Sequence, residues 1–513
     1  MLREVEVENG KIRGLPAADP RITSFKGIPF AAPPLGKNRW RAPQPAEGWD
    51  GVLEAFEFAP ISMQATPGVD KSNIYSREWH VDPDIPMSED CLYLNVWTPA
   101  ESTDEKLPVY VWYFGGGFQY GYTAEMEFDG ERIARRDVVV VTVNYRLNVF
   151  GFLCHPEITA ENPEAPANFG HLDQQAGVEW VKRNITAFGG DPDNITIGGQ
   201  SAGGASVLTQ LTSPQNKDFC QRAIIQSGLF TRLYPDDNMP GVGRSLTEVE
   251  QEGVKFFDYL GVSSLAEARQ LDAEYIRDKS LEYKKIWGTV IDNKFCVDDP
   301  FELFLENKRC MVPVLLGHTS TEFFTTPDVE TIDEFKDMAV RLFGDDADKY
   351  LDLCQVQSGN IEQVLEKASA SRIEYAIRVA GRANAETGAD LPLYYYIFDA
   401  EIPGWDNPGT FHSVDLWFFF ETLAKCWRPF VGKHYDLARQ MCNYWANFIS
   451  NGDPNGKDAT GEDMTQWNPY TLKAPYGMVF GDKVEFVEEK PDDLMKFLVE
   501  QYFLKDEKYN EDL

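Results

Sequence analysis

The chain has 513 residues, of which 43% are hydrophobic and 25% charged, and this composition excludes a mostly disordered or fibrous protein. Its 48 basic and 82 acidic residues give a formal net charge of −34. A field of that sign repels phosphate backbones and anionic lipid headgroups, so we expect neither a nucleic acid nor a membrane surface as a partner. No uninterrupted apolar run reaches the roughly 18 residues that a membrane-spanning helix needs.

The N-terminal stretch and the cysteines indicate where the chain resides. The first residues, MLREVEVENGKIRG, contain no apolar core of a secretory signal. The eight cysteines are scattered, with no CxxC pair and no cluster of histidines beside them. This spacing argues against a zinc site and against a dense disulfide framework. We therefore expect buried, reduced thiols, no metal and a cytoplasmic location.

Short β-branched and aromatic runs predict strands that are buried on both faces, because they are continuously apolar rather than alternating. The predicted strands are residues 109–114, 138–143, 195–197, 223–226, 312–316 and 393–398. Helical patterns separate them, including residues 173–188, which place Asp173 at a helix N-terminus and end at Gly189. Strands and helices in alternation predict an α/β fold with a mostly parallel sheet. Residues from about 240 to 390 read as a helical insertion that also contributes the 312–316 strand.

The strongest local motif is the stretch Ile-Gly-Gly-Gln-Ser-Ala-Gly-Gly at residues 197–204. A strand that runs directly into Gly-x-Ser-x-Gly is typical of a nucleophile elbow, in which Ser201 stands at the strand's carboxyl end. The turn is so tight that Gly199 and Gly203 must lack side chains. The alternative is a glycine-rich turn with a bystander serine.

A second glycine motif follows the 109–114 strand as Gly115-Gly116-Gly117-Phe118. Backbone N–H groups in such a loop can point at an oxyanion that develops during acyl transfer. Gly116 and Gly117, together with Ala202 after the serine, are the candidate donors. The alternative is a flexible turn.

A serine hydroxyl needs a base, and an acid to orient that base. In hydrolases with this elbow the order along the chain is serine, acid, histidine. His318, His412 and His434 follow the serine, and His434 reads as a surface residue. The loop position of His412, after the 393–398 strand, favours it as the base. Glu322, just beyond the 312–316 strand, is a candidate acid, with Asp415 as a rival.

The ordered motifs together resemble the type-B carboxylesterases, the cholinesterase-like branch of the α/β-hydrolases. The resemblance covers nearly the whole chain, and the motifs that carry it are FKGIPFAAPP from residue 25, RWRAP from 39, SEDCLYLNV from 88, GGGF from 115, NYRL from 144, DQ at 173, FGGDP from 188, the serine elbow, IQSG from 225, Glu322, the His412 loop, and Trp445 with GDPN from 452.

This resemblance implies an α/β-hydrolase fold over residues 1–513, with helical insertions over the active site. It implies Ser201 as nucleophile, His412 as base and Glu322 as acid. It also implies oxyanion donors at Gly116, Gly117 and Ala202. Two structural ion pairs are implied as well, Arg39 with Glu89 and Arg146 with Asp173. No cofactor is implied, and the expected source is bacterial.

The chain departs from the family pattern at four positions. Gln200 stands before the serine where the family has Glu, which predicts a weak preference for cationic substrates. Ser62 stands where Cys91 normally finds its disulfide partner, so Cys91 is expected to be a free thiol. Phe323 follows the acid where Gly is common, and is expected to alter packing under it. Trp79 resembles the aromatic residue that binds quaternary ammonium groups in cholinesterases, but is expected to serve packing.

The expected activity is hydrolysis of neutral short- to medium-chain or aryl carboxylic esters by a monomer or homodimer. A specialised hydroxycinnamoyl (feruloyl-type) esterase is the alternative. A lipase would need a hydrophobic lid, and a non-catalytic interaction protein of this family generally lacks the nucleophile. The aromatic run Trp417-Phe418-Phe419-Phe420 is expected to pack in the core, with one or two of its members at a substrate pocket.

Overall fold

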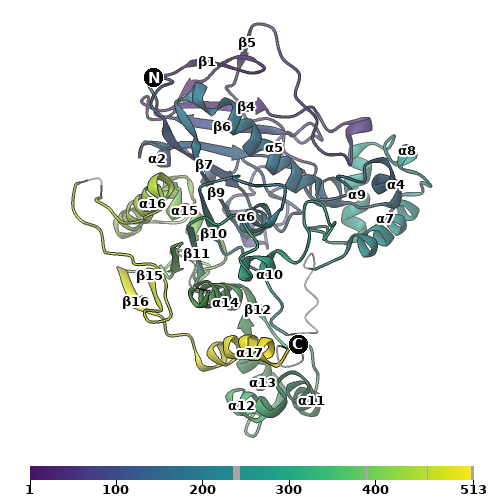
Figure 1. Ribbon diagram of the computed structural model, residues 1–513, viewed down its shortest axis with the longest axis vertical. Coiled ribbons are helices and arrows are strands. Elements are labelled where there is room, and N and C mark those ends of the chain that lie inside the picture. Colours follow the sequence, from purple (N-terminus) through teal and green to yellow (C-terminus); the bar gives the residue numbers. More distant parts are fainter. Residues whose placement is uncertain (235–242, 388–390, 459, 510–513) are drawn as a thin grey trace.

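A central eleven-stranded sheet runs through the computed structural model, which describes residues 1–234, 243–387, 391–458 and 460–509 (Figure 1). The order across the sheet is β16-β15-β14-β11-β10-β9-β7-β8-β6-β4-β3. The run from β15 to β8 is parallel, and antiparallel strands complete both edges. The predicted α/β class with a mostly parallel sheet is confirmed. The strands of the sheet are β3 (Leu15–Pro16), β4 (Thr23–Pro29), β6 (Tyr93–Thr98), β7 (Leu107–Tyr113), β8 (Val139–Val143), β9 (Gly190–Gln200), β10 (Arg222–Gln226), β11 (Val314–Thr319), β14 (Leu393–Phe398), β15 (Tyr476–Phe480) and β16 (Val484–Glu488).

Two smaller sheets and the helices complete the described chain. β1 (Glu4–Val7), β2 (Gly10–Arg13) and β5 (Val52–Glu54) form one small sheet, and β12 (Phe324–Thr325) pairs with β13 (Ala370–Ser371). The helices are α1 (Ile74–Glu78), α2 (Glu131–Ala134), α3 (Asn148–Phe152), α4 (Pro156–Glu161), α5 (Phe169–Asn184), α6 (Ala202–Thr212), α7 (Leu246–Leu260), α8 (Leu265–Ala268), α9 (Ala273–Tyr283), α10 (Pro300–Leu305), α11 (Ile332–Phe343), α12 (Ala347–Leu353), α13 (Ile361–Ala368), α14 (Arg372–Glu386), α15 (Asp415–Phe419), α16 (Gly432–Asn451) and α17 (Asp493–Tyr509).

All six predicted strands are present, and two of them have an end displaced by three residues or more. The strand predicted at 195–197 extends over Gly190–Gln200 because it continues through the glycines that precede the serine. Glycine has low strand propensity because it has no side chain to pack, so the sequence pattern predicts a strand that ends before these glycines. The strand predicted at 312–316 lies at Val314–Thr319 and so includes His318.

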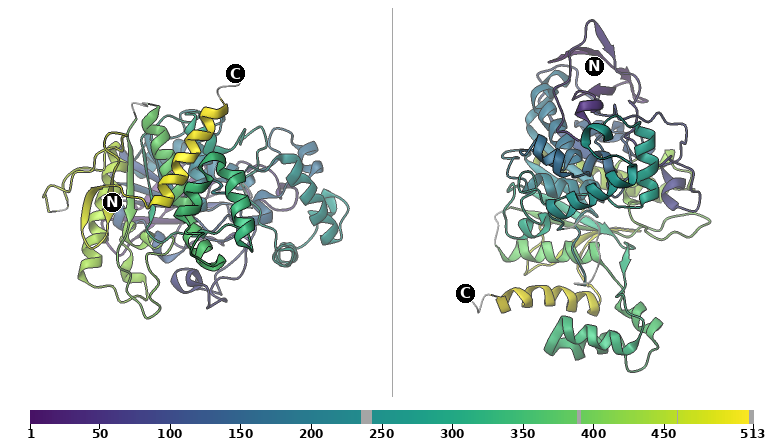
Figure 2. Two further views of the ribbon diagram at one scale, coloured as in Figure 1. Left: turned by 90° about the horizontal axis from the view of Figure 1, so that it is seen from below. Right: turned by 90° about the vertical axis from the view of Figure 1, so that its right-hand side faces the viewer.

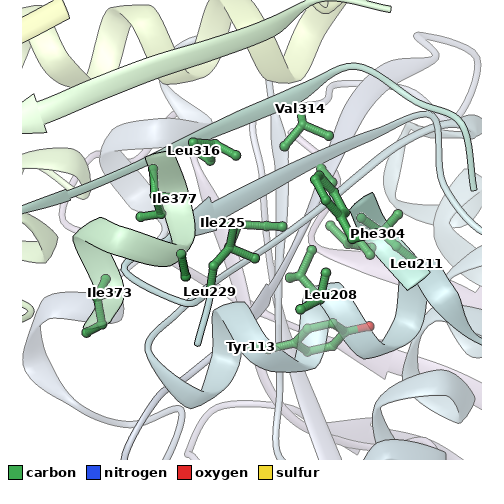
Figure 3. Close-up of a cluster of buried hydrophobic side chains, with 14 of the residues drawn as sticks. Tyr113, Leu208, Leu211, Ile225, Leu229, Phe304, Val314, Leu316, Ile373 and Ile377 are labelled. Carbon is green, nitrogen blue, oxygen red and sulfur yellow. The ribbon is translucent and has the colours of Figure 1, made fainter. Parts of the chain in front are cut away.

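Both faces of the sheet are covered, and successive residues of β7 show how. Val109 and Val111 point into one hydrophobic cluster, which includes side chains of α5, α6, α10 and α14. Tyr110 and Trp112 point into a second cluster, with α15 and α16. Side chains alternate across a strand, so an all-apolar strand requires a core on each side. Figure 3 shows part of the first cluster, where Leu208, Ile225 and other labelled side chains meet.

The helix predicted at 173–188 begins earlier. α5 starts at Phe169, and its last turn is a 3₁₀ turn that ends at Gly189, whose φ of 79° is the left-handed conformation that glycine favours. The placement of Asp173 at a helix N-terminus is therefore wrong. Asp173 lies inside the helix and is fully buried, and its charge is matched by Arg146 instead.

The stretch from residue 240 to 390 divides in space. α7, α8 and α9 pack beside α4 at one side of the sheet, and α11, α12 and α13 lie with α17 beyond α14 (Figures 1 and 2). Between these groups the chain returns to the sheet as β11. The helical part of this stretch therefore flanks a core strand whose carboxyl end carries candidate site residues.

Two buried ion pairs tie distant segments together, as the family resemblance implied. Arg39 Nη2 lies 2.6 Å from Glu89 Oε2, and Arg146 Nη2 lies 2.7 Å from Asp173 Oδ1. Arg39 also donates to the carbonyl oxygens of Ala268 at the end of α8 and of a nearby loop residue. Since removal of one partner leaves an uncompensated charge in the interior, such a pair holds its segments in register.

The change Asp173→Asn tests the Arg146–Asp173 pair. It keeps the shape of the side chain but leaves the Arg146 guanidinium without a counter-charge, so we expect the free energy of unfolding to fall by about 3–5 kcal/mol. Urea denaturation measures this loss. The control is Asp436→Asn in the exposed pair with Arg439, which should change stability by no more than about 0.5 kcal/mol. Equal effects of the two variants would contradict a structural role for the buried pair.

Candidate active site

Ser201 stands between β9 and α6 in a backbone conformation that few residues adopt. Its φ and ψ are 56° and −124°. A Cβ added to Gly199 would lie 2.3 Å from the Gly203 carbonyl carbon, and one added to Gly203 would lie 2.0 Å from the Tyr113 carbonyl oxygen. Both glycines must therefore lack side chains, as the motif predicted. Strain of this kind, which costs about 1–3 kcal/mol, persists only where the surrounding structure holds it.

The glycine loop after β7 lies beside the serine. Gly116 has a φ of 107°, and a Cβ there would lie 2.0 Å from the Tyr120 carbonyl oxygen. Gly116, Gly117, Ala202 and Ser201 line one cavity. Within the part of the chain that the structure describes, the Ser201 hydroxyl has no hydrogen-bond partner. The backbone N–H of Ser201 donates to the Gln226 carbonyl oxygen at 2.9 Å.

Glu322 and His412 meet through a hydrogen bond between Glu322 Oε2 and His412 Nδ1. Glu322 follows β11 and His412 follows β14, and the carboxyl ends of these parallel neighbours lie at the same edge of the sheet as the end of β9. The other carboxylate oxygen of Glu322 accepts from the backbone N–H of Thr319 at 3.0 Å. Both side chains are almost fully buried.

Burial opposes ionisation of Glu322, but the neighbouring charge and hydrogen bond of His412, with the Ser227 hydroxyl, hold the pKa of the carboxyl below its ordinary value. An ionised Glu322 accepts the Nδ1–H of His412, which leaves Nε2 of the imidazole as an acceptor. This is the tautomer that a general base requires.

The loops that carry the acid and the histidine are joined to each other. Thr321 and Phe411 form a parallel bridge, and the Thr321 hydroxyl lies 3.1 Å from that of Thr410. Each neighbours a site residue in the chain, so the bridge fixes the separation of Glu322 and His412.

Gln200, the residue before the serine, contacts the histidine from the other side. Its amide nitrogen lies 3.1 Å from His412 Nε2 and donates to Ser413 Oγ at 2.6 Å. The site therefore holds a neutral amide beside Nε2, where the family pattern would put a carboxylate.

The remaining candidates lie apart from this cluster. Asp415, the rival acid, accepts from Tyr396 Oη at 2.9 Å and from Gln226 Nε2 at 3.2 Å, and burial raises its pKa to about 6. His318 contacts the Tyr395 hydroxyl and a backbone carbonyl. The prediction that His434 lies on the surface is wrong. The ring of His434 is buried. Its Nδ1 atom accepts a hydrogen bond from the backbone N–H of Val431 and so caps the start of α16.

The cavity above Ser201 has a volume of about 510 Å³ and mainly apolar walls. Phe323 is 52% exposed and its ring lies 4.6 Å from that of His412, so it covers the histidine rather than packing under the acid as predicted. Trp79 is buried as expected, but it also lines the cavity. Each member of the 417–420 aromatic run is buried in the core, as predicted. The expectation that one or two of them line a substrate pocket is wrong for this cavity, whose wall, among the described residues, contains none of the four.

A buried polar cluster in the cavity wall was missed by the sequence reading. His80 Nε2 lies 3.2 Å from Glu125 Oε1, and Glu125 also accepts from the backbone N–H of Tyr122 at 2.8 Å. The carboxyl group of Glu127 is fully buried and lies against that of Glu125. Burial raises the pKa of both carboxyl groups, to about 8 for Glu125, and lowers that of His80 to about 4. The stretch Ala-Glu-Met-Glu-Phe reads as an ordinary acidic turn, so only its placement reveals the cluster.

An ionic clamp holds part of the same wall. The side chain of Arg428 is fully buried and donates to Glu78 Oε1 at 2.8 Å and to Asp406 Oδ1 at 2.9 Å. Arg77 reaches the other oxygen of Asp406 at 3.3 Å. Glu78 ends α1, directly before Trp79, and Asp406 lies on the segment that leads to His412. The clamp therefore joins the cavity wall to the histidine loop.

Among the described residues, none of the His, Cys, Asp and Glu side chains form a group of three or more that is arranged to hold a metal ion. The helices of the same residues are each too short or too polar to cross a membrane. All eight cysteines fall within the described ranges as free thiols, Cys91 among them.

Comparison with known proteins gives consistent matches over the whole length. The sequence profile of the carboxylesterase family matches residues 2–494. The chain is 31% identical over 465 residues to the para-nitrobenzyl esterase of Bacillus subtilis (strain 168), which covers 88% of this chain and 90% of that protein. It is 30% identical over 470 residues to the fumonisin B1 esterase of Sphingopyxis macrogoltabida, covering 87% and 82%. A solved carboxylesterase of Geobacillus stearothermophilus superposes with a TM-score of 0.74 at 30% identity, covering 97% of this chain and 99% of that one.

The buried carboxyl pair predicts a pH dependence of stability. The folded protein keeps a proton on Glu125 up to a pKa of about 8, whereas the unfolded chain releases it near its ordinary pKa of 4.5. The stability that this difference contributes is fully present below the pKa of Glu125 in the unfolded chain. It is lost as the pH rises towards the pKa of Glu125 in the folded protein. Between about pH 5 and 8 we expect wild type to lose stability relative to the Glu125→Gln, Glu127→Gln double variant, by up to about 1.4 kcal/mol per pH unit for each retained proton.

Urea denaturation at several pH values measures this difference. Glu488→Gln, at an exposed position of β16, is the control and should give a curve parallel to wild type. A double variant whose stability also runs parallel to wild type would show that neither carboxyl group holds its proton on folding.

Proposed function

The chain belongs to the carboxylesterase family and is a carboxylic ester hydrolase, and from this premise we propose that Ser201, His412 and Glu322 form its catalytic triad. In this proposal His412 Nε2 takes the hydroxyl proton of Ser201 as the serine oxygen attacks the ester carbonyl. The backbone N–H groups of Gly116, Gly117 and Ala202 stabilise the oxyanion. His412 then protonates the leaving alcohol, and water repeats the cycle on the acyl-enzyme.

The observation that carries the proposal is the hydrogen bond from His412 Nδ1 to a buried Glu322 whose pKa is lowered, in the same cavity as the strained Ser201. An ionised acid there orients the imidazole and stabilises its protonated form in the transition state. Attack requires Nε2 to exchange its contact with the Gln200 amide for one with the serine hydroxyl. A catalytic hydrogen bond often forms only when the substrate is bound.

We propose neutral short- to medium-chain or aryl carboxylic esters as the substrates. The support is the mainly apolar, aromatic wall of the cavity and the uncharged Gln200 beside the nucleophile. Phe323, which lies over His412, offers an aromatic face to an aryl group. Hydroxycinnamoyl esters are the alternative, since the same wall would accept an aromatic acyl group.

Removal of the nucleophile or the acid tests the triad. Ser201→Ala should lower kcat by about 10⁴-fold or more, because the variant lacks the hydroxyl group that attacks the ester. Glu322→Gln should lower it by about 10⁴-fold, because the neutral amide no longer selects the required tautomer. The measurement is the initial rate on p-nitrophenyl esters from acetate to palmitate, with methyl ferulate alongside.

We expect the wild-type rate to peak at short or medium chains. A peak on methyl ferulate would select the hydroxycinnamoyl alternative. A sudden rise above the solubility limit of long-chain esters would point to a lipase. The triad proposal fails if wild type does not exceed Ser201→Ala on any ester.

Gln200→Glu tests the charge selectivity. The change places a negative charge beside the nucleophile without altering side-chain shape, so it should raise the rate on acetylcholine relative to its neutral carbon isostere by about tenfold. The ratio of kcat/KM values for the two esters is the readout, because it cancels any general effect of the change on His412. An unchanged ratio would mean that the residue before the serine does not set charge preference.

A further inference from the structure

One end of the catalytic cavity presents polar atoms that the proposed mechanism does not use. Tyr75, His80 and Tyr120 line the cavity beside Trp79. The His80 and Tyr120 rings meet edge to face at 5.3 Å between centroids, and the rings of Tyr75 and Trp79 lie 5.7 Å apart. We call this part of the cavity the tyrosine recess.

The polar atoms of the tyrosine recess are available to a ligand. Within the described residues, the hydroxyl groups of Tyr75 and Tyr120 and the Nδ1 atom of His80 have no hydrogen-bond partner. Tyr120 is 36% exposed, and the Tyr75 hydroxyl and His80 Nδ1 are not sealed from solvent. Glu125 Oε1 accepts the backbone N–H of Tyr122, so we place the ring N–H of His80 at Nε2, where it donates to the same oxygen, and Nδ1 is then an acceptor. The recess thus offers one acceptor and two hydroxyl groups that both donate and accept.

The residues behind the recess, Glu125 and Glu127, determine whether the recess is charged or neutral. Glu125 lies behind His80, and Glu127 lies behind Glu125 with its carboxyl group fully buried. Burial and their mutual contact raise the pKa of both carboxyl groups, so the pair is uncharged at neutral pH. Burial also keeps the pKa of His80 low, which leaves its ring neutral. A neutral hydrogen-bonding group of the ligand therefore suits the recess better than a cation, and the neutral Gln200 beside the nucleophile adds no charge.

The position of the recess indicates which part of an ester reaches it. Phe411 precedes His412, and its ring stacks on Trp79 at 6.3 Å and lies 6.4 Å from that of Tyr75. The recess is therefore on the His412 side of the cavity. Since His412 protonates the leaving alcohol in the proposed mechanism, the alcohol part of the ester departs on this side.

We propose that the tyrosine recess is a subsite for a neutral hydroxyl group on the alcohol part of the ester, bound by Tyr75, Tyr120 and His80 Nδ1. This inference rests on the proposed function and deepens it. The preferred substrates are then esters of aryl or alkyl alcohols that carry a further hydroxyl group several bonds from the ester oxygen. The Glu125–Glu127 pair acts indirectly, by holding the tautomer of His80.

A matched set of four acetates tests the subsite: phenethyl acetate and its p-hydroxy, p-methoxy and p-trimethylammonio derivatives. All share one acyl group, so differences in kcat/KM report the alcohol subsite. We expect the p-hydroxy ester to exceed the parent and p-methoxy esters by about three- to tenfold, the size of a net hydrogen bond. Tyr120→Phe and Tyr75→Phe each delete one oxygen atom and should reduce this preference. Tyr275→Phe, on α9 outside the cavity wall, is the control and should keep it.

Glu125→Leu separates the positioning role from general damage. Because leucine neither donates nor accepts a hydrogen bond, it no longer fixes the tautomer of His80, so the p-hydroxy preference should fall while the pH profile of phenethyl acetate hydrolysis stays in place. A shift of that profile would assign Glu125 to the catalytic chemistry instead.

The outcomes are distinguishable from failure of the proposed function. If wild type does not hydrolyse phenethyl acetate faster than Ser201→Ala, the proposed function fails and the subsite with it. If it does, but the p-hydroxy and p-methoxy esters react equally, the subsite proposal is overturned alone. A preference for the p-trimethylammonio ester would also overturn it, and would identify the recess as a cation site formed by aromatic rings and the carboxyl pair.

Discussion

The contact between Gly203 and the end of β7 sets the geometry on which the rest of the site depends. α6 can begin directly after Ser201 only because Gly203 lies against the Tyr113 carbonyl, where no Cβ fits. Tyr113 is the last residue of β7, and only Phe114 separates it from the glycine loop, so the same contact places the loop beside the serine. A Cβ on Gly115 would lie 3.1 Å from the Ser201 Cβ, which shows how closely the two segments approach. The strained backbone of the serine is thus maintained by close packing on both sides.

Buried carboxyl groups near this contact differ in protonation because their donors differ. Glu322 has an imidazole and a backbone N–H as partners, and its pKa is lowered despite burial. Asp415 has only the uncharged donors of Tyr396 and Gln226 among its described hydrogen bonds, and its pKa is raised to about 6. Glu125 faces another carboxyl group and is raised further. All three carboxyl groups are buried, so their hydrogen-bonding and charged partners decide how each pKa shifts. These partners determine whether a group is ionised and orients a histidine, or stays neutral as part of the wall.

The sequence predicts what depends on local backbone chemistry and fails where distant segments meet. The elbow at Ser201 was predictable because Gly199 and Gly203 leave a fixed spacing, and the strands were predictable because both faces of β7 are apolar. The burial of His434 was not, because its ring caps a helix start whose position depends on packing. The cluster of His80 with Glu125 joins a loop before β6 to a turn after β7, and each half alone reads as solvent-exposed polar chain. Phe323 shows the same limit: its place next to the acid is visible in the sequence, but its position over His412 is set by the bridge between Thr321 and Phe411.

The segment between Ser62 and Cys91 shows how the protein compensates for a missing covalent link. It supplies Tyr75, Trp79 and His80 to the cavity wall, and its ends are not bridged by a disulfide. Arg428, which lies outside this segment, holds it in place instead. Its fully buried guanidinium group forms ion pairs with Glu78 in the segment and with Asp406. Charges in such surroundings are strongly penalised when separated, so the segment cannot leave the histidine loop without exposing both partners to that cost. The tyrosine recess and His412 are therefore held in a fixed relation by the two ion pairs of Arg428.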